Sequence, residues 1–445
     1  MSRFQAIFIG IIIVLVFLAF LVLSGFLPGL PGLGGGKEVS LAMWGTLPKE
    51  VFQRPIEILN KKNHKIFVLK YFEKDETTYE KVLVDALASG TGPDIFLIDQ
   101  SFVLKHQNKI SLFPFTSFTE RQFKDAFADE AELFLAKDGI VAFPLIIDPI
   151  VLYWNKDFFG KKGLASPPKT WDEFLDKVTV LTSRDRSGNI IESGAALGEF
   201  KNVKNAKDIF SLLVLQGGTK IVEKDTLNVT LNEKGSVSAT PAISALTFYT
   251  NFSNPSKISY SWNRALPNSR DMFITGKLAM YFGFAGEYTG ISDANPHLNF
   301  DVAAVPQVKD SPLEATFGKI YGLAVSKNSP YAVGQALTAV FNMAMDQEVA
   351  VLLGENAKLP SARRDILSGG TLDAVLSVFY RAAVQARGWL EPDSKAVSDM
   401  VEDMIDSIVS GKKNFSKAVL DMVDLLKAEI EPIKQSRMAP PPSAF

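Results

Sequence analysis

The sequence has no cysteine among its 445 residues and only three histidines. The absence of cysteine excludes disulfides, thiolate metal sites, thiol catalysis and a lipid-modified N-terminal cysteine. His64, His106 and His297 do not have the spacing of metal ligands, and neither G-x-S-x-G nor G-x-x-x-x-G-K-[ST] occurs. The sequence therefore indicates no catalytic residue, no metal and no cofactor, and any membrane attachment must be made by the polypeptide itself.

The sequence also lacks an excess of charge of one sign. Its 47 basic and 49 acidic residues give a formal net charge of −2, and no run of Lys and Arg is longer than a pair. A basic surface for nucleic acid is therefore not expected. Hydrophobic residues make up 47% of a chain whose length suits two globular lobes of roughly 150 to 200 residues each.

One long apolar run is present near the N-terminus. Residues 6–23 are almost wholly apolar, with Arg3 before them and no further charge until Lys37. Such a helix is about 27 Å long, enough to cross a bilayer, whereas the apolar part of a secretory signal is usually about 7 to 15 residues. We therefore predict an uncleaved transmembrane anchor over residues 6–27, with a signal cleaved after Ser24 as the alternative.

The flanks of this run predict its orientation. Arg3 places a cytoplasmic stub, residues 1–5, inside the cell, so the rest of the chain lies outside the cell membrane, or is secreted if the segment is cleaved. Residues 28–37 are rich in Gly and Pro and predict a flexible tether. At the other end, the Pro-rich residues 436–445 predict a disordered tail.

The hydrophobic pattern after the tether alternates between strands and helices. We predict strands at 39–44, 65–72 and 94–99, separated by helices at 48–60 and 79–87, the last ended by Gly90. This order predicts a parallel sheet covered by helices. Further along the chain we predict helices at 208–215 and 241–252, strands at 278–282, 300–305 and 320–326, and a helical C-terminal third. The loop at 185–192 is interpreted as a hairpin turn rather than a calcium loop.

Several segments match those of a known family in order and spacing. They are Met43-Trp44-Gly45, residues 87–95, residues 142–148 with 153–159, residues 167–174, residues 273–280 and residues 321–326. Together they resemble the extracellular solute-binding proteins of ABC importers, family 1, which includes the maltose-binding protein. The resemblance implies a two-lobed α/β periplasmic-binding-protein-like fold (type II) whose hinge-linked lobes close on a ligand.

The resemblance also implies a division of the chain and the walls of a cleft. Lobe 1 would comprise residues 38–148 and 303–345, and lobe 2 residues 149–302 and 346–435. The residues implied to line the cleft are Trp44 to Leu47, Asp99, Gln100, Asp148 and Gly283 to Tyr288. Thr46 and Leu47 stand where maltose-binding proteins have a charged pair, so maltodextrin specificity is not implied.

The residue types at these positions suit a sugar, whose hydroxyls need acceptors and whose ring faces pack on flat aromatic groups. The substrate-binding candidates are Trp44, Thr46, Asp99, Gln100, Asp148, Trp154, Trp262, Glu287, Tyr288 and Trp389. Trp44 has a core position as its alternative, and Asp99 a helix N-cap. Trp154 is expected to be half buried. Trp262 and Trp389 lie in polar, loop-like sequence and are expected to be exposed for stacking.

We therefore predict an extracytoplasmic binding protein, not an enzyme, that delivers a sugar or oligosaccharide to an ABC permease by lobe closure. The expected partners are this ligand, the permease and, through the N-terminal helix, the membrane; the protein is expected to be a monomer that binds no nucleic acid. Two alternatives remain open. One is a tethered ligand sensor for a membrane receptor kinase, and the other is a glycosidase, since the separation of two carboxylates is a three-dimensional property.

Overall fold

The computed structural model describes residues 39–438. The predicted stub at 1–5, the anchor at 6–27 and the tether at 28–37 lie outside the described residues, as do residues 439–445. Among residues 39–438, no single helix is both long and apolar enough to cross a membrane, although the helices Gln335–Met345 and Gln347–Ala357, bent by 70° at their junction, meet the criteria of length and composition as a pair.

Most of the strands in residues 39–438 belong to one 11-stranded sheet. Its strands are β1 (Val39–Gly45), β2 (Phe67–Glu73), β3 (Ile95–Ile98), β4 (Ile110–Ser111), β7 (Phe143–Asn155), β8 (Ser183–Arg184), β9 (Ile190–Ala195), β10 (Leu278–Phe284), β11 (Phe300–Ala303), β12 (Thr316–Ser326) and β13 (Ala386–Arg387). The principal order is β2-β1-β3-β12-β7-β10-β9-β8. A separate pair is formed by β5 (Leu135–Ala136) and β6 (Gly139–Ile140).

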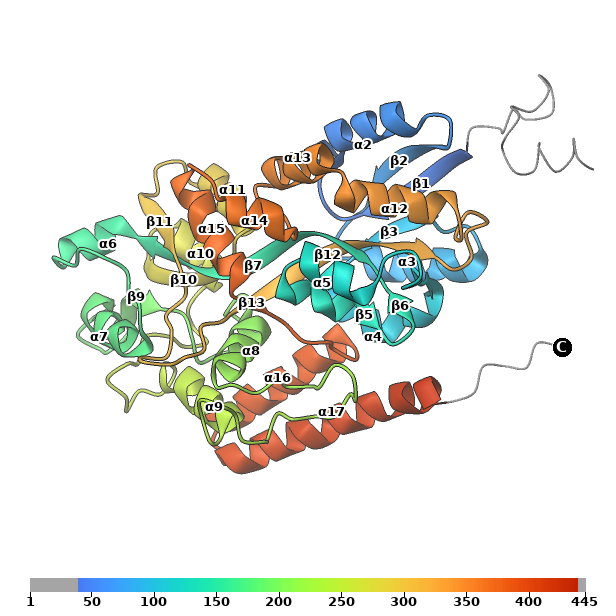
Figure 1. Cartoon of the computed structure of the whole chain (residues 1–445). Helices are drawn as coiled ribbons and strands as arrows, with labels where there is room; N and C mark the ends of the chain where they lie inside the picture. The colour runs from blue at the N-terminus through green and yellow to red at the C-terminus, as the bar shows by residue number, and fades with distance from the viewer. Residues whose placement is uncertain (1–38, 439–445) are drawn as a thin grey trace, which may run out of the picture.

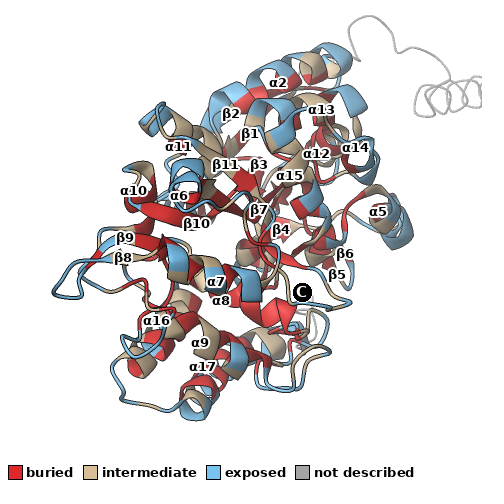
Figure 2. Ribbon diagram, turned by 90° about the vertical axis from the view of Figure 1, so that its left-hand side faces the viewer, coloured by how far each residue is buried: buried red, intermediate tan, exposed pale blue. Residues whose placement is uncertain are grey.

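Helices surround this sheet. They are α2 (Lys49–Asn63), α3 (Tyr79–Ser89), α4 (Val103–His106), α5 (Glu120–Ala126), α6 (Lys156–Lys161), α7 (Trp171–Leu181), α8 (Ala206–Gln216), α9 (Pro241–Asn251), α10 (Ser269–Ile274), α11 (Glu287–Ala294), α12 (Gln335–Met345), α13 (Gln347–Ala357), α14 (Arg364–Gly369), α15 (Ala374–Val384), α16 (Ser394–Val409) and α17 (Phe415–Met438). Short 3₁₀ turns are η1 (Gln100–Phe102), η2 (Gln107–Lys109) and η3 (Asp129–Phe134). Buried residues gather along the strands and on the inner faces of the helices (Figure 2).

The predicted strand–helix alternation at the start of the chain is confirmed. Strand β1 pairs in parallel with β2 and β3, and helices α2 and α3 connect them. Helix α2 buries the apolar stripe that the sequence shows, including Phe52 and Leu59. Helix α3 ends where predicted, because Gly90 adopts the left-handed conformation (φ 74°) that Gly tolerates best and its N–H reaches the last carbonyls.

Two long antiparallel strands, β7 and β12, cross the middle of the molecule between the two halves of the sheet (Figure 1). We call β1, β2 and β3 with their helices the first half, and β8, β9, β10 and β11 with theirs the second half. Strand β12 pairs with β3 in the first half, whereas β7 pairs with β10 and β11 in the second. The crossing strands therefore connect both halves directly.

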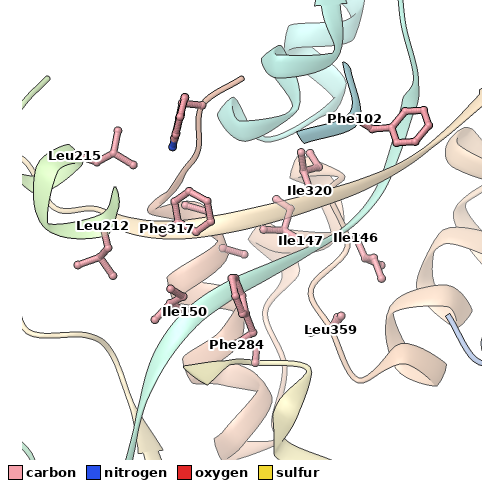
Figure 3. Close-up of a cluster of buried hydrophobic side chains, with 14 of the residues drawn as sticks. Phe102, Ile146, Ile147, Ile150, Leu212, Leu215, Phe284, Phe317, Ile320 and Leu359 are labelled. Atoms are coloured by element: carbon pink, nitrogen blue, oxygen red, sulfur yellow. The ribbon is translucent and has the colours of Figure 1, made fainter. Parts of the chain in front are cut away.

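The crossing is packed with buried side chains (Figure 3). Ile147 and Ile150 of β7 lie beside Phe317 and Ile320 of β12, and Leu212 of α8 closes one side of this cluster. Each of these side chains is almost wholly removed from solvent. Burying one such side chain stabilises a protein by about 1.5–3 kcal/mol. This cluster therefore fixes the positions of β7 and β12, and with them the polar side chains that point away from the cluster.

Two parts of the chain differ from expectation. Helix α13 packs against α2, and α14 packs against α5, so residues 347–369 lie with the first half rather than with the second lobe, where we had placed 346–435. Helix α17 continues to Met438, so residues 436–438 are helical and not part of a disordered tail. The hairpin turn before β9 is confirmed, since Asp185 accepts hydrogen bonds from the N–H groups of Ser187 and Asn189.

Candidate functional site

Two predicted residues lie at the carboxyl ends of the parallel strands of the first half, the edge where ligands of α/β sheets usually bind. Trp44, at the end of β1, is partly buried, and Lys74 Nζ lies 4.0 Å from the centroid of its ring. Asp99 follows β3 and caps η1, with Oδ1 accepting from Ser101 N at 2.8 Å. Both bonds that Ser101 donates go to Oδ1, so Oδ2 of Asp99 remains available for a ligand. Thr46 lies nearby in the chain and is partly exposed.

Gln100 is buried beneath β12 rather than open to solvent. Its Nε2 donates to the carbonyl of Gly318 at 2.9 Å, and its Oε1 accepts from the N–H of Ile320 at 2.9 Å. Both ends of the amide are thus committed to the backbone of β12. Gln100 fixes the position of this strand and of the side chains between its two contacts.

Lys319 lies on β12 between those two contacts and directly opposite Asp148 of β7. It is partly exposed, and its Nζ lies 4.3 Å from the ring centroid of Phe284. Within residues 39–438, its ammonium makes no hydrogen bond and no salt bridge. Burial lowers the pKa of Lys319, but Asp208, Tyr321, Asp99 and Asp148 together raise it above the usual value of 10.5, so the amine stays protonated.

Tyr321 follows two positions later and so projects from the same face of β12. Its ring is partly exposed, and in the part of the chain that the structure describes its hydroxyl has no hydrogen-bond partner. Burial raises the pKa of Tyr321 above its usual value of 10.0, so the hydroxyl stays neutral and can donate. The Lys319 ammonium and the Tyr321 hydroxyl are therefore both available for hydrogen bonds to a ligand.

Asp148 is buried within β7, with 8% of its surface exposed. Its Oδ1 accepts from the N–H of Gly286 at 2.8 Å, just before α11. A Cβ at position 286 would lie 2.9 Å from Oδ2, so glycine is required for this close approach. Burial raises the pKa of Asp148 to about 7, although the Gly286 bond and the charge of Lys319 act in the opposite direction.

Asp208, in the first turn of α8, was not among the predicted site residues. It is only 7% exposed, yet no hydrogen bond to its carboxylate occurs within the described residues. It lies on the wall of a cavity of about 460 Å³ formed by the loop before α8, the start of α8 and α16. The lining residues are Phe200, Lys201, Val203, Lys204, Asn205, Ala206, Lys207, Asp208, Asn268, Ser398 and Glu402.

Asp208 connects this cavity to the crossing strands, because it is also among the groups that raise the pKa of Lys319. Its neighbour Lys207 is already neutralised by Glu391, whose Oε2 lies 2.7 Å from Nζ. Phe200 is partly exposed on the cavity wall and offers an aromatic face. The cavity and the polar face of β12 therefore lie on neighbouring elements, since α8 packs against β12.

Glu287 holds this region in shape. Its carboxylate accepts from Asn205 Nδ2 at 2.8 Å and Tyr281 Oη at 2.7 Å, and pairs with Arg270 at 3.2 Å. Glu287 therefore braces the start of α11 and is largely committed. Tyr288 is partly exposed and packs against Phe300, with 5.5 Å between ring centroids.

The solvent exposure of the tryptophans confirms the expectation for Trp154 and contradicts it for Trp262 and Trp389. Trp154 is half buried, as expected, and packs edge-on against Phe159 at 4.9 Å. Trp262 and Trp389 are not exposed: they retain 0% and 2% of their surface, and their Nε1 atoms donate to Asn202 Oδ1 and Ser211 Oγ. Buried partners for the indole N–H explain why polar neighbours in the sequence did not indicate exposure.

Of the predicted residues, the structure brings Asp99 and Asp148 close to Lys319, while Trp44, Thr46 and Tyr288 remain partly exposed. Lys319, Tyr321, Asp208 and Phe200 were missed. One signal was available, since Lys319 is the only charged residue in the apolar strand β12. Within residues 39–438, no group of three or more His, Asp or Glu could hold a metal ion.

Comparisons with known proteins agree with this architecture. The family profile described as bacterial extracellular solute-binding protein matches residues 51–346. A curated binding protein of Brucella abortus is 24% identical over 232 residues, which cover 51% of this chain and 52% of that protein. The chain thus spans about half the length of this relative. The maltodextrin-binding protein MdxE of Bacillus subtilis is 24% identical over 319 residues, or 69% of this chain and 71% of MdxE.

Two solved structures show the same fold. An ABC substrate-binding protein from Listeria monocytogenes, in complex with cycloalternan, has a TM-score of 0.68 and 18% identity, covering 89% of this chain and 100% of that one. A cyclic α-maltosyl-1,6-maltose binding protein from Arthrobacter globiformis has a TM-score of 0.71 and 17% identity, covering 90% of this chain and 100% of that one. The predicted two-lobed α/β periplasmic-binding-protein-like fold is therefore confirmed for the part of the chain that the structure describes.

Proposed function

The chain belongs to the bacterial extracellular solute-binding protein family, and from this premise we propose that it captures a sugar or oligosaccharide between its two halves. As a member of this family it is an extracytoplasmic substrate-binding protein of ABC transport and not an enzyme. The finer statement is that the halves close on a carbohydrate and that the closed form docks on an ABC permease.

The observation that carries this proposal is the convergence of polar groups that the protein leaves without partners. Lys319 and Tyr321 lie on β12 and Asp208 lies on α8, which packs against β12, and none of the three side chains is hydrogen-bonded within residues 39–438. A ligand with many hydroxyls would satisfy all three, because a hydroxyl both donates and accepts.

Aromatic groups on the same walls suit the ring faces of a sugar. Trp44 on β1 and Phe200 on the cavity wall are both partly exposed. We propose these two as stacking surfaces, with Thr46 and Asp99 contacting the ligand from the first half and Tyr288 from the second. Trp262, Trp389 and Gln100 have no place in this revised set, because their polar atoms are committed inside the protein.

Similar proteins support a carbohydrate as the ligand class. Three of the similar proteins are described as binding maltodextrin, cycloalternan and cyclic α-maltosyl-1,6-maltose. All three are oligosaccharides built from several sugar rings. We extend only the chemical class to this chain, since Thr46 and Leu47 replace the charged pair of maltose-binding proteins.

The arrangement at the membrane is likewise a proposal. Residues 6–27 would anchor a monomeric protein with its body outside the membrane, where it could meet the permease. The crossing strands β7 and β12 would act as hinge segments, because they are the chain's direct connections between the first and second halves.

A thermal-shift screen of the full-length protein tests the proposed ligand class. Maltotriose, maltotetraose and mannotriose would be compared with di- and tripeptides and with glycerol phosphate. A ligand at about 100 times its Kd stabilises by about 2.7 kcal/mol, and closure should lower the radius of gyration in small-angle scattering. Stabilisation by peptides or glycerol phosphate alone would overturn the carbohydrate assignment. Loss of sugar uptake on deleting the gene would favour transport over a sensor role.

A further inference from the structure

The charge distribution around Lys319 is the feature that extends this proposal. Asp148 of β7 lies directly opposite Lys319, Asp99 precedes Gln100, which bonds to β12 on both sides of Lys319, and Asp208 belongs to α8, which packs against β12. All three carboxyls also raise the pKa of the Lys319 amine. The Lys319 ammonium therefore stands among three carboxyl groups, while the nearby Lys207 ammonium is paired with Glu391. Glu287, which lies near Asp148, is likewise already paired with Arg270.

The Lys319 ammonium has a fixed position but makes no hydrogen bond within the described residues. The backbone of β12 on both sides of Lys319 is tied to Gln100, and the cross-strand neighbour Asp148 directs its Oδ1 to Gly286 instead. The Nζ atom rests over the ring of Phe284, a contact that positions a cation but takes none of its three N–H donors. A rigid, partly exposed ammonium with free donors is suited to a ligand oxygen.

We propose that Lys319 is a ligand-binding residue, and that Asp99, Asp148 and Asp208 around it make the site select a neutral, hydroxyl-bearing solute over a carboxylate-bearing one. This inference rests on the proposed capture of a carbohydrate. Lys319 donates to a hydroxyl oxygen of the ligand, while Asp208 and the free oxygens of Asp99 and Asp148 accept from neighbouring hydroxyls. Adjacent hydroxyls on one sugar ring offer this alternation of acceptor and donor.

The same arrangement opposes an acidic sugar. A carboxylate placed beside Lys319 would gain one favourable interaction but would meet the carboxylates of Asp99 and Asp208, one from each half of the molecule. Like charges repel more strongly in a partly desolvated site than in bulk water. We expect an acidic oligosaccharide to bind at least about tenfold more weakly than a neutral one of equal length.

Titration calorimetry on the full-length protein tests both parts of this inference. The probes are maltotriose and mannotriose as neutral trisaccharides, and trigalacturonate as the acidic one. The Lys319→Met variant should bind the neutral sugar at least about tenfold more weakly, while its circular dichroism spectrum stays native. Lys309→Met, at an exposed lysine, is the matched control and should bind like the wild type.

A second variant does not depend on the first. Asp208→Asn removes one negative charge and keeps the shape of the side chain. The ratio of the affinity for the neutral sugar to that for the acidic sugar should therefore fall by about threefold or more. Wild-type affinity in Lys319→Met, equal binding of trigalacturonate and neutral sugars by the wild type, or an unchanged preference in Asp208→Asn would each overturn this inference while leaving carbohydrate capture standing. If the wild type binds no carbohydrate of either charge, the proposed function fails and this inference fails with it.

Discussion

Carbohydrate binding should depend on pH through Asp148. Burial raises the pKa of this carboxyl to about 7, so near neutral pH it is about half protonated in the ligand-free protein. A sugar hydroxyl donates to the ionised form, and such charge-assisted hydrogen bonds are roughly twice as strong as neutral ones. Ligand binding therefore favours loss of the proton, and affinity should fall as the pH drops below about 7.

The size of the effect follows from the ionised fraction. Two pH units below its pKa a carboxyl is about 1% ionised, so a ligand that requires the carboxylate binds about 100-fold more weakly at pH 5 than at pH 8, or about 2.7 kcal/mol. Above pH 8 the affinity should no longer change, because Asp148 is then fully ionised. Asp148→Asn cannot ionise and should bind about 100-fold more weakly at pH 8, as the wild type does at pH 5, without this dependence on pH.

Titration calorimetry with the best sugar, at pH 5, 6, 7 and 8, measures this profile for the wild type and for Asp148→Asn. Asp138→Asn, at an exposed position, serves as the matched control and should follow the wild-type curve. Identical pH profiles for wild type and Asp148→Asn would refute the reasoning, since they would show that this carboxyl neither titrates in the range nor contacts the ligand.

Three further predictions concern residues around the crossing. Burial raises the pKa of Glu130 to about 8, so the folded protein keeps a proton that the unfolded chain loses above about 4.5. The free energy of unfolding in urea should therefore fall as pH rises from about 4.5 to about 8 in the wild type but not in Glu130→Gln. An equal dependence of stability on pH in the two proteins would contradict this. Trp389→Ala should lower the unfolding free energy by about 3–5 kcal/mol, because the ring is 2% exposed, and a loss below 1 kcal/mol in denaturant melts would show that the indole is not packed as described. Gly286→Ala should weaken sugar binding while the circular dichroism spectrum stays native, because its Cβ would lie 2.9 Å from Asp148 Oδ2; unchanged affinity would mean that this contact does not shape the site.

The fold could be predicted from the sequence to the extent that local patterns determine it. The alternation of residues 39–99 and the stop at Gly90 encode their strands and helices within a few neighbouring residues, and these elements form as expected. The position of residues 347–369 could not be obtained in this way. Their attachment to the first half depends on contacts of α13 with α2, which is nearly 300 residues earlier in the chain.

The site residues, too, could be predicted only in part from the sequence. Asp99 and Asp148 could be proposed because each stands at a position that the family resemblance marks. Asp208 could not be, because an acidic residue in the first turn of a helix is ordinarily explained by the helix dipole. Only the three-dimensional structure shows that this residue is 7% exposed and accepts no hydrogen bond from the described residues. The burial of Trp262 and Trp389 could not be predicted either, because their hydrogen-bond partners Asn202 and Ser211 are distant in the sequence.

Hydrogen–deuterium exchange of the full-length protein, with and without the sugar that gives the largest thermal shift, tests the central claim most directly. If the solute is captured between the two halves, the backbone around Lys319 and Tyr321 on β12, residues 205–208 at the start of α8 and the turn after β3 at Asp99 should all become more protected when the sugar is bound. Protection confined to one half of the molecule, or to surfaces away from β12, would contradict the account.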